Sequence, residues 1–386
     1  MKLKRPFVLL IERDAPRPLS MQQLLSSDAT ATGWRALAPH LGCEVPLQLA
    51  DLAVFDALGE DQLVSREDLS RRFGAERIDY LVHNGLLIGD HAGHEHWLLR
   101  DRLLKDTGWW APAAVAHSFG RWQGIDVDAD QKRTGKRTIG GLVQQHGPPP
   151  PEALDLRARE DWLALPAARK TQLDSLLAQR TTCRNFDPGH HLPVADIASL
   201  MHRVFGAQAT QELAPGAIAL KKNSPSGGGL HPIEAYLLVQ RAHGVAPGLY
   251  HYHSTAHALQ VLRLLDADEI APMAKELVAG QPWFADAPIL VLMAARFTRN
   301  FWKYRNHAKA WRVIQLDAGH LSQNLYLTAT ELGYGAFVTG AINDECAERL
   351  FELDGISMGA IAVCGFGRRI ATRSAVEFDP LGKAVG

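Results

Sequence analysis

The sequence predicts an α+β fold in two parts that are separated by a proline-rich stretch. In the second part, helical patterns alternate with short apolar segments of strand length, which is typical of a sheet covered by helices. The expected strands are Ala235–Gln240, Gly248–His253, Ala258–Leu262, Ile289–Ala295, Gly335–Thr339 and Gly359–Gly365. Residues 311–332 keep apolar side chains at helical spacing and end at Gly333, so they predict a helix of about 33 Å.

The stretch Gly140–Pro151 marks the break between the two parts. It contains four consecutive prolines, which cannot continue a helix and favour an extended spacer. We therefore divide the chain into an N-terminal domain of residues 1–105, a connecting segment of residues 106–153 with a proline-rich linker, and a larger domain of residues 154–386.

Composition excludes several classes of protein. The chain has 386 residues, with 41 Lys and Arg against 42 Asp and Glu, so its net charge of -1 predicts no bulk attraction to nucleic acid or membrane. The four cysteines are far apart, which indicates neither a disulfide framework nor a thiolate metal site. The longest apolar runs are far below the ~20 residues of a membrane span. We expect a cytoplasmic protein without a signal peptide.

The N-terminal domain predicts a winged-helix-like unit. Three short helical segments, at Leu49–Leu58, at Leu69–Phe73 with Ser65 as its N-cap, and at Ala75–Asn84, precede a β-hairpin formed by Leu86–Gly89 and Trp97–Arg100. Between residues 65 and 84, four arginines are matched by four acidic residues, which argues against a DNA-reading helix. Peptide docking remains open. Three histidines at the hairpin tip have no nearby cysteine, so we expect no metal site there.

Three segments of the larger domain carry residues suited to an anionic or planar ligand. Arg180 and Arg184 lie four residues apart at a helix end, where two guanidinium groups suit a phosphate. Ser224, Ser226 and three glycines form a loop that lets backbone amides approach a ligand closely. Two glycines and two arginines, residues 365–369, follow the last expected strand. Taken singly, each segment is equally compatible with solvated charges or a flexible turn.

In their order and spacing, these segments resemble the flavin-dependent nitroreductase superfamily, and within it the SagB-type, or ThcOx-type, dehydrogenases that oxidise azoline rings in ribosomally made peptides. The likeness covers about residues 113–369, with threonine in place of the family's serine at Thr182. The residues that carry it are Arg180, Thr182 and Arg184; Pro225–Gly228, Glu234 and Tyr236; Gly248–Tyr252; Lys303 and Tyr304; and Asp317, Gly319, His320, Gln323 and Asn324.

The resemblance implies an FMN-binding domain with a mixed sheet flanked by helices, which forms a homodimer with FMN at the interface. The implied cofactor contacts are Arg180, Thr182, Arg184, Arg368 and Arg369 at the phosphate or ribityl chain; Ser224, Ser226 and Gly227 at the isoalloxazine; Gly340 and Ala341 at its reactive N5 edge; and Gln323. The implied catalytic residues are Lys303 and Tyr304, one of which acts as a base. Both side chains have pKa values near 10 in water, so we expect Phe301, Trp302 and the flavin to desolvate the pair.

The expected function is therefore FMN-dependent oxidation of a precursor peptide, with azoline to azole as the leading reaction and other peptide-modifying enzymes as candidate partners. Dehydrogenation to a dehydroamino acid remains an alternative within the same class. An NAD(P)H-dependent nitroreductase or quinone reductase that acts on small molecules is a second alternative, and a non-catalytic peptide- or DNA-binding protein is a third. The sequence names neither the peptide nor the final electron acceptor.

Overall fold

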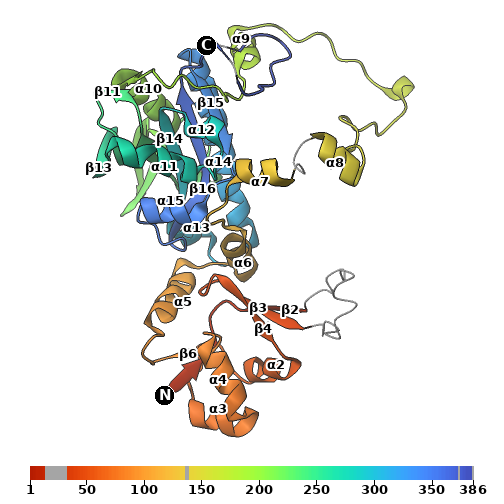
Figure 1. Cartoon of the computed structure of the whole chain (residues 1–386), viewed down its shortest axis with the longest axis vertical. Helices are drawn as coiled ribbons and strands as arrows, with labels where there is room; N and C mark the ends of the chain where they lie inside the picture. Colours follow the sequence, from red (N-terminus) through yellow and green to blue (C-terminus); the bar gives the residue numbers. More distant parts are fainter. Residues whose placement is uncertain (14–32, 135–138, 373, 385–386) are drawn as a thin grey trace.

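The computed structural model describes residues 1–13, 33–134, 139–372 and 374–384. Its larger domain is built on a six-stranded sheet with the order β13-β12-β10-β14-β16-β15 (Figure 1). The strands are β10 (Ile233–Val239), β12 (Gly248–His253), β13 (Ala258–Leu264), β14 (Ile289–Arg296), β15 (Gly335–Thr339) and β16 (Met358–Gly367). Neighbouring strands pair antiparallel, and Thr182 adds a parallel bridge to Ala336 in β15. The α+β prediction is confirmed.

Helices cover both faces of this sheet, so two apolar cores form. Because side chains alternate along a strand, Leu237 and Val239 of β10 enter one core while Tyr236 and Leu238 enter the other. The first core packs against α10 (Val194–Phe205) and α14 (Ala308–Glu331), and the second against α11 (Ala267–Leu277), α12 (Pro282–Ala285) and α15 (Asp344–Leu350).

The long helix predicted at residues 311–332 is α14. Its residues Ile314, Ala318, Leu321 and Leu325 are buried, as their spacing predicts. Leu316, which would widen the apolar face, is instead 55% exposed. One side of α14 is therefore left uncovered by the described elements of its own chain.

The N-terminal unit has its own apolar core and lies beneath the larger domain in Figure 1. A three-stranded sheet, β2-β3-β4, is followed by three helices. Ser65 caps the second of these helices by accepting a hydrogen bond from the Asp68 amide at 3.1 Å. The elements are β2 (Leu10–Arg13), β3 (Trp34–Ala38), β4 (Cys43–Leu47), α2 (Leu49–Asp56), α3 (Arg66–Phe73) and α4 (Ala75–His83).

The predicted β-hairpin of this unit is wrong. Trp97–Arg100 lies within the helix α5 (Glu95–Thr107), because that segment contains no glycine or proline until Gly108. The strand β6 (Ile88–Gly89) forms as expected, but it pairs with β1 (Lys2–Lys4), which also pairs with β5 (Val64–Ser65). The N-terminal strand thus takes the place that the prediction gave to Trp97–Arg100.

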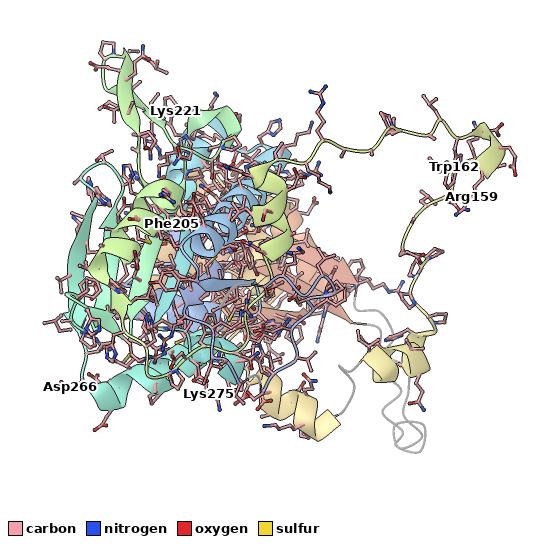
Figure 2. The ribbon with its side chains drawn as sticks, turned by 90° about the horizontal axis from the view of Figure 1, so that it is seen from above. Arg159, Trp162, Phe205, Lys221, Asp266 and Lys275 are labelled. Carbon is pink, nitrogen blue, oxygen red and sulfur yellow. The ribbon has the colours of Figure 1, made fainter. Side chains whose placement is uncertain are left out.

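The segment between the two parts is more structured than a plain connection. It contains α6 (Ala111–Gly120), α7 (Val127–Thr134) and α8 (Ile139–His146), and three residues of α6 belong to the first core. After α8, residues 147–171 form an exposed arm that extends away from the body, with Arg159 and Trp162 at its outer end (Figure 2), and then joins α9 (Gln172–Gln179).

Two further features complete the fold. The hairpin of β8 (Ala209–Ala214) and β9 (Ala217–Lys221), which is not among the expected strands, leads into the glycine-rich loop. Within the described residues, no helix combines the length and the apolar character needed to cross a membrane.

Candidate functional site

The glycine-rich loop after β9 is held against α14 by one carboxylate. The Ser226 hydroxyl donates to Asp317 Oδ2 at 2.5 Å, and the Gly227 amide donates to Asp317 Oδ1 at 3.1 Å. Burial raises the pKa of Asp317, and the two hydrogen bonds oppose that shift. A Cβ atom at Gly227 would overlap the side chain of Val313, so only glycine allows this close approach.

Two other motif residues of α14 also contact this loop. His320 Nδ1 lies 3.3 Å from the carbonyl oxygen of Pro225, and the Asn324 side chain donates to Ser224 Oγ at 3.4 Å. Asp317, His320 and Asn324 are three and four positions apart, which places them on one face of the helix. The sequence motif therefore serves, within one chain, to shape the loop Ser224–Gly229.

Lys303 and Tyr304 reach the same loop from α13 (Phe297–Tyr304). Lys303 Nζ lies 3.5 Å from the carbonyl oxygen of Gly228. Gly228 has a φ of 65°, and a Cβ atom there would lie 2.9 Å from Lys303 Nζ and would overlap the Tyr304 hydroxyl. The structure thus brings both candidate catalytic side chains to the glycine backbone.

The expected desolvation of this pair by Phe301 and Trp302 is not found. Trp302 is 70% exposed, and Phe301 points into the first core. The reason is the helical period of α13, which turns Phe297 and Phe301 inward and leaves Trp302 and Lys303 at the surface.

Arg180, Thr182 and Arg184 follow α9 in an extended segment. The Arg180 guanidinium lies 5.3 Å from the ring centre of Tyr326, and Thr182 Oγ1 lies 3.0 Å from the Tyr326 hydroxyl. Arg184 lies over a different ring, with its guanidinium 6.0 Å from the centre of Phe284. The two arginines are therefore directed by separate aromatic side chains.

The other two predicted arginines are engaged within the chain. Arg369 is buried, forms an ion pair with Glu377 and donates to Thr181 Oγ1 at 3.0 Å. Arg368 is more exposed, and its Nε donates to Asp187 Oδ2 at 3.0 Å. Arg368 and Arg369 are therefore not a pair of free phosphate ligands. The carboxylate that pairs with Arg369 is that of Glu377, in the C-terminal segment. No sequence motif pointed to Glu377.

Gly340 and Ala341 follow the end of β15, and Gly340 lines a cavity of about 250 Å³. The Ala341 amide donates to Thr339 Oγ1 at 3.1 Å, and a Cβ atom at Gly340 would meet nothing within 4 Å. The cavity lining includes His117, Arg121, Trp311, Gln315 and Asp344. Gln323, the last predicted contact, lies exposed on α14.

A buried ion pair lies next to this cavity. Arg121 pairs with Glu348, whose side chain is 4% exposed. Burial raises the pKa of Glu348 to about 7, although Arg121 acts in the opposite direction. Burial also lowers the pKa of His117, whose Nε2 lies 2.9 Å from the carbonyl oxygen of Gly355, to about 4.

The predicted contacts do not form one cluster within a single chain. Asp317, which holds the glycine-rich loop, and Tyr326, which holds Arg180 and Thr182, are nine positions apart on α14. At 3.6 residues per turn, nine positions correspond to opposite faces of the helix and to about 14 Å along its axis. Among the described residues, the loop meets the pair Lys303–Tyr304 directly, whereas Arg184 and Arg369 come together at Glu377, which accepts from the Arg184 amide at 2.6 Å.

Comparison with known proteins identifies the family of this domain. A model of the nitroreductase family matches residues 177–368, which include the loop, α13, α14 and the arginines described above. Residues 177–368 belong to the nitroreductase family. The predicted resemblance to this family and the nitroreductase-like fold are thereby confirmed.

Three individual matches extend this result. MJ1384 of Methanocaldococcus jannaschii, which is named as a nitroreductase, is 28% identical over 191 residues, covering 50% of this chain and 89% of its own length. The trifolitoxin-processing protein TfxB of Rhizobium leguminosarum bv. trifolii is 30% identical over 136 residues, covering 35% of this chain and 36% of its own. A chain of the E. coli microcin synthetase complex McbBCD, solved with truncated pro-MccB17 bound, has a similar fold, with a TM-score of 0.51 at 20% identity over 69% of this chain and 97% of that chain.

The matches differ in how much of the protein they cover. This nitroreductase-family chain spans most of MJ1384 but only about a third of TfxB. The N-terminal unit lies outside the family model, which begins at residue 177.

Proposed function

We propose that the protein is an FMN-dependent dehydrogenase in the maturation of a ribosomally made peptide, and that it removes two hydrogens from an azoline ring to form an azole. The observation that carries this proposal is the convergence of Lys303 and Tyr304 on Gly228 within a nitroreductase-family domain. A reductase of small molecules has no evident use for two proton-transfer side chains placed together at this loop.

The described residues fit FMN. Gly229 and Gly340 carry no side chain, and a Cβ atom at either position would meet nothing within 4 Å. A flat ring system can therefore approach the backbone at both places. Arg180 and Arg184 supply guanidinium groups for a phosphate, whereas Arg369 is already paired with Glu377. When bound, FMN supplies the acceptor for an electron pair and one hydrogen.

We infer that two copies of the chain share each FMN. The loop Ser224–Gly229 and the segment Arg180–Arg184 lie on opposite faces of α14, so a second copy is needed to bring one of each together. The exposed side of α14, with Leu316 at its surface, supports an interface between copies along this helix.

The pair Lys303–Tyr304 has the task of removing the other hydrogen as a proton. A general base has to lie within hydrogen-bond reach of that proton, and both side chains extend over Gly228 at the loop that would face the flavin. Lys303 is exposed in the single chain, so the second copy and the substrate have to exclude water from it.

We propose that the N-terminal unit docks the precursor peptide. A groove of about 480 Å³ lies between β4 and the helices α3 and α4, with Gln48, Phe73, Glu76 and Tyr80 in its lining. Strand β4 is at the edge of its sheet, and the carbonyl oxygen of Pro46 in this strand accepts a hydrogen bond from the Tyr80 hydroxyl at 2.7 Å. The similarity to the trifolitoxin-processing protein supports a peptide substrate.

The purified protein tests this proposal directly. We expect the absorbance spectrum of bound flavin and, with a candidate precursor peptide, a product that mass spectrometry finds lighter by two hydrogens. The similarity to MJ1384 keeps a small-molecule reductase as the second candidate, and that activity predicts bleaching of the flavin by NADPH within milliseconds to seconds. A protein that takes up no FMN would overturn both.

A further inference from the structure

The last helix of the N-terminal unit connects that unit to the helix that carries Lys303 and Tyr304. In α5, the carboxylate of Asp101 is buried and accepts hydrogen bonds from Lys4 Nζ at 2.5 Å and from the Phe7 amide at 2.6 Å. These contacts fix α5 within the N-terminal unit. The helix ends at Gly108, whose φ of 82° turns the chain toward the larger domain.

Trp109 follows this turn and enters the first core of the larger domain. Its side chain is 1% exposed, and its ring centre lies 4.6 Å from that of Phe297 and 4.8 Å from that of Phe301. Its Nε1–H donates to the carbonyl oxygen of Ile356 at 2.8 Å, so the orientation of the indole is fixed as well. The inward face of α13 therefore packs directly on Trp109.

The two residues that follow Lys303 and Tyr304 in the chain contact the turn that precedes Trp109. The amide of Asn306 donates to the carbonyl oxygen of Gly108 at 2.9 Å, and the Arg305 guanidinium donates to the carbonyl oxygen of Asp106 at 3.3 Å. Residues before and after the pair are thus both held by the Asp106–Trp109 junction. An eight-residue helix is too short to be stable alone, so these contacts help to fix the position of α13, together with the hydrogen bonds of Arg299 to Leu230 and of Asn300 to Ala310.

We propose that Trp109 is a positioning residue that holds Lys303 and Tyr304 over Gly228, and that through α5 it links their position to the N-terminal unit. This inference rests on the proposed function, in which the pair acts on the substrate proton. Trp109 itself is enclosed by Phe297, Phe301 and neighbouring core side chains, so it acts through α13.

The matched variants are Trp109→Leu and Trp110→Leu. Trp110 is the next residue and is 38% exposed, so its replacement controls for loss of an indole at this junction. We expect Trp109→Leu to retain flavin and an unchanged KM for the precursor peptide, while single-turnover peptide oxidation slows at least tenfold. Hydrogen exchange at residues 300–306 should accelerate in Trp109→Leu alone. Trp110→Leu should match the unchanged protein in all four measurements.

A combined variant separates positioning from a general loss of structure. If Trp109 acts through Lys303 and Tyr304, adding Trp109→Leu to a protein that already carries Lys303→Ala and Tyr304→Phe should slow peptide oxidation no further. A further slowing in that combined variant, or a Trp109→Leu rate equal to that of Trp110→Leu, would overturn the proposal. If Trp109→Leu does not fold, Trp109→Phe keeps a ring but loses the bond to Ile356, and an unchanged rate and unchanged exchange in it would overturn the proposal.

Different results would contradict the proposed function and the positioning role of Trp109. If Lys303→Ala and Tyr304→Phe oxidise peptide at full rate, the pair is not the base, and hydrogen exchange at residues 300–306 still decides whether Trp109 positions α13. If these two variants are slow while Trp109→Leu is not, only the positioning role is lost.

Discussion

The side chain of Asp317 accepts hydrogen bonds from both the hydroxyl of Ser226 and the amide of Gly227, and so fixes the glycine-rich loop to the long helix. Ser226 and Asp317 are 91 positions apart in the chain. The loop is the part of the domain that Lys303 and Tyr304 approach, so one buried carboxylate sets the geometry on which the proposed chemistry depends.

Replacement of this carboxylate should weaken cofactor binding. We expect Asp317→Ala to lower FMN affinity at least tenfold, because hydrogen bonds to a charged group contribute about 1.5 to 3 kcal/mol each. Fluorescence titration of the apoprotein with FMN measures the effect. Arg312→Ala, at an exposed position of the same helix, is the control. Equal affinities in the two variants would mean that the loop keeps its shape without Asp317.

The guanidinium groups of Arg180 and Arg184 should hold the FMN phosphate. Replacing both with alanine should weaken FMN binding more than a hundredfold, since two charge-assisted bonds of roughly 1.5 to 3 kcal/mol are lost. Arg71 and Arg72, on α3 of the N-terminal unit, allow a control that removes the same charge elsewhere. Full flavin occupancy in a folded Arg180→Ala, Arg184→Ala protein would assign the phosphate to other residues.

The sheet could be predicted well from the sequence because glycine and polar residues delimit its apolar runs. Strands β12 and β15 have the predicted bounds, each beginning at a glycine. The segment Trp97–Arg100 was misassigned because four residues of mixed polarity fit either a strand or a helix. Tertiary contacts resolve the ambiguity, since α5 anchors Asp101 in the N-terminal unit.

The candidate site could be predicted as separate short motifs but not in the contacts between them. Local patterns predicted the loop, the pair at 303–304 and the arginines as candidates, because each is a short run of unusual composition. The ion pair between Arg369 and Glu377 could not be found this way, as nothing in the C-terminal sequence marks Glu377. The separation of the loop from Arg180 across α14 likewise depends on how strands and helices pack.

The groove of the N-terminal unit should govern affinity for the precursor peptide. Tyr80→Ala removes a side chain that lines this groove, and we expect the KM for a full-length precursor to rise at least fivefold while flavin content stays constant. Leu49→Ala, at a 68% exposed position of α2 outside the groove lining, is the matched control. An unchanged KM in Tyr80→Ala would move peptide docking to another surface.

The buried Glu348 should make the stability of the protein depend on pH. Its pKa in the folded protein is raised to about 7, mainly by burial, from an ordinary value of 4.5. The protonated form is therefore favoured by folding, so the stabilising contribution is complete below pH 4.5 and is lost as the pH rises through about 7. Denaturant unfolding across this range should show a steeper loss for the unchanged protein than for Glu348→Gln. Parallel curves would exclude this titration.

Lys303 and Tyr304 provide the most direct test of the chemistry. Lys303→Ala and Tyr304→Phe should retain bound flavin, because neither side chain belongs to the arginine or serine contacts, yet each should slow single-turnover peptide oxidation by about 10² to 10⁴, the usual contribution of a positioned general base. Lys309→Ala, an exposed lysine at the start of α14, is the control for loss of charge. If both variants reduce flavin at the unchanged rate, the base lies elsewhere, and His320, which contacts the loop at Pro225, is the next residue to replace.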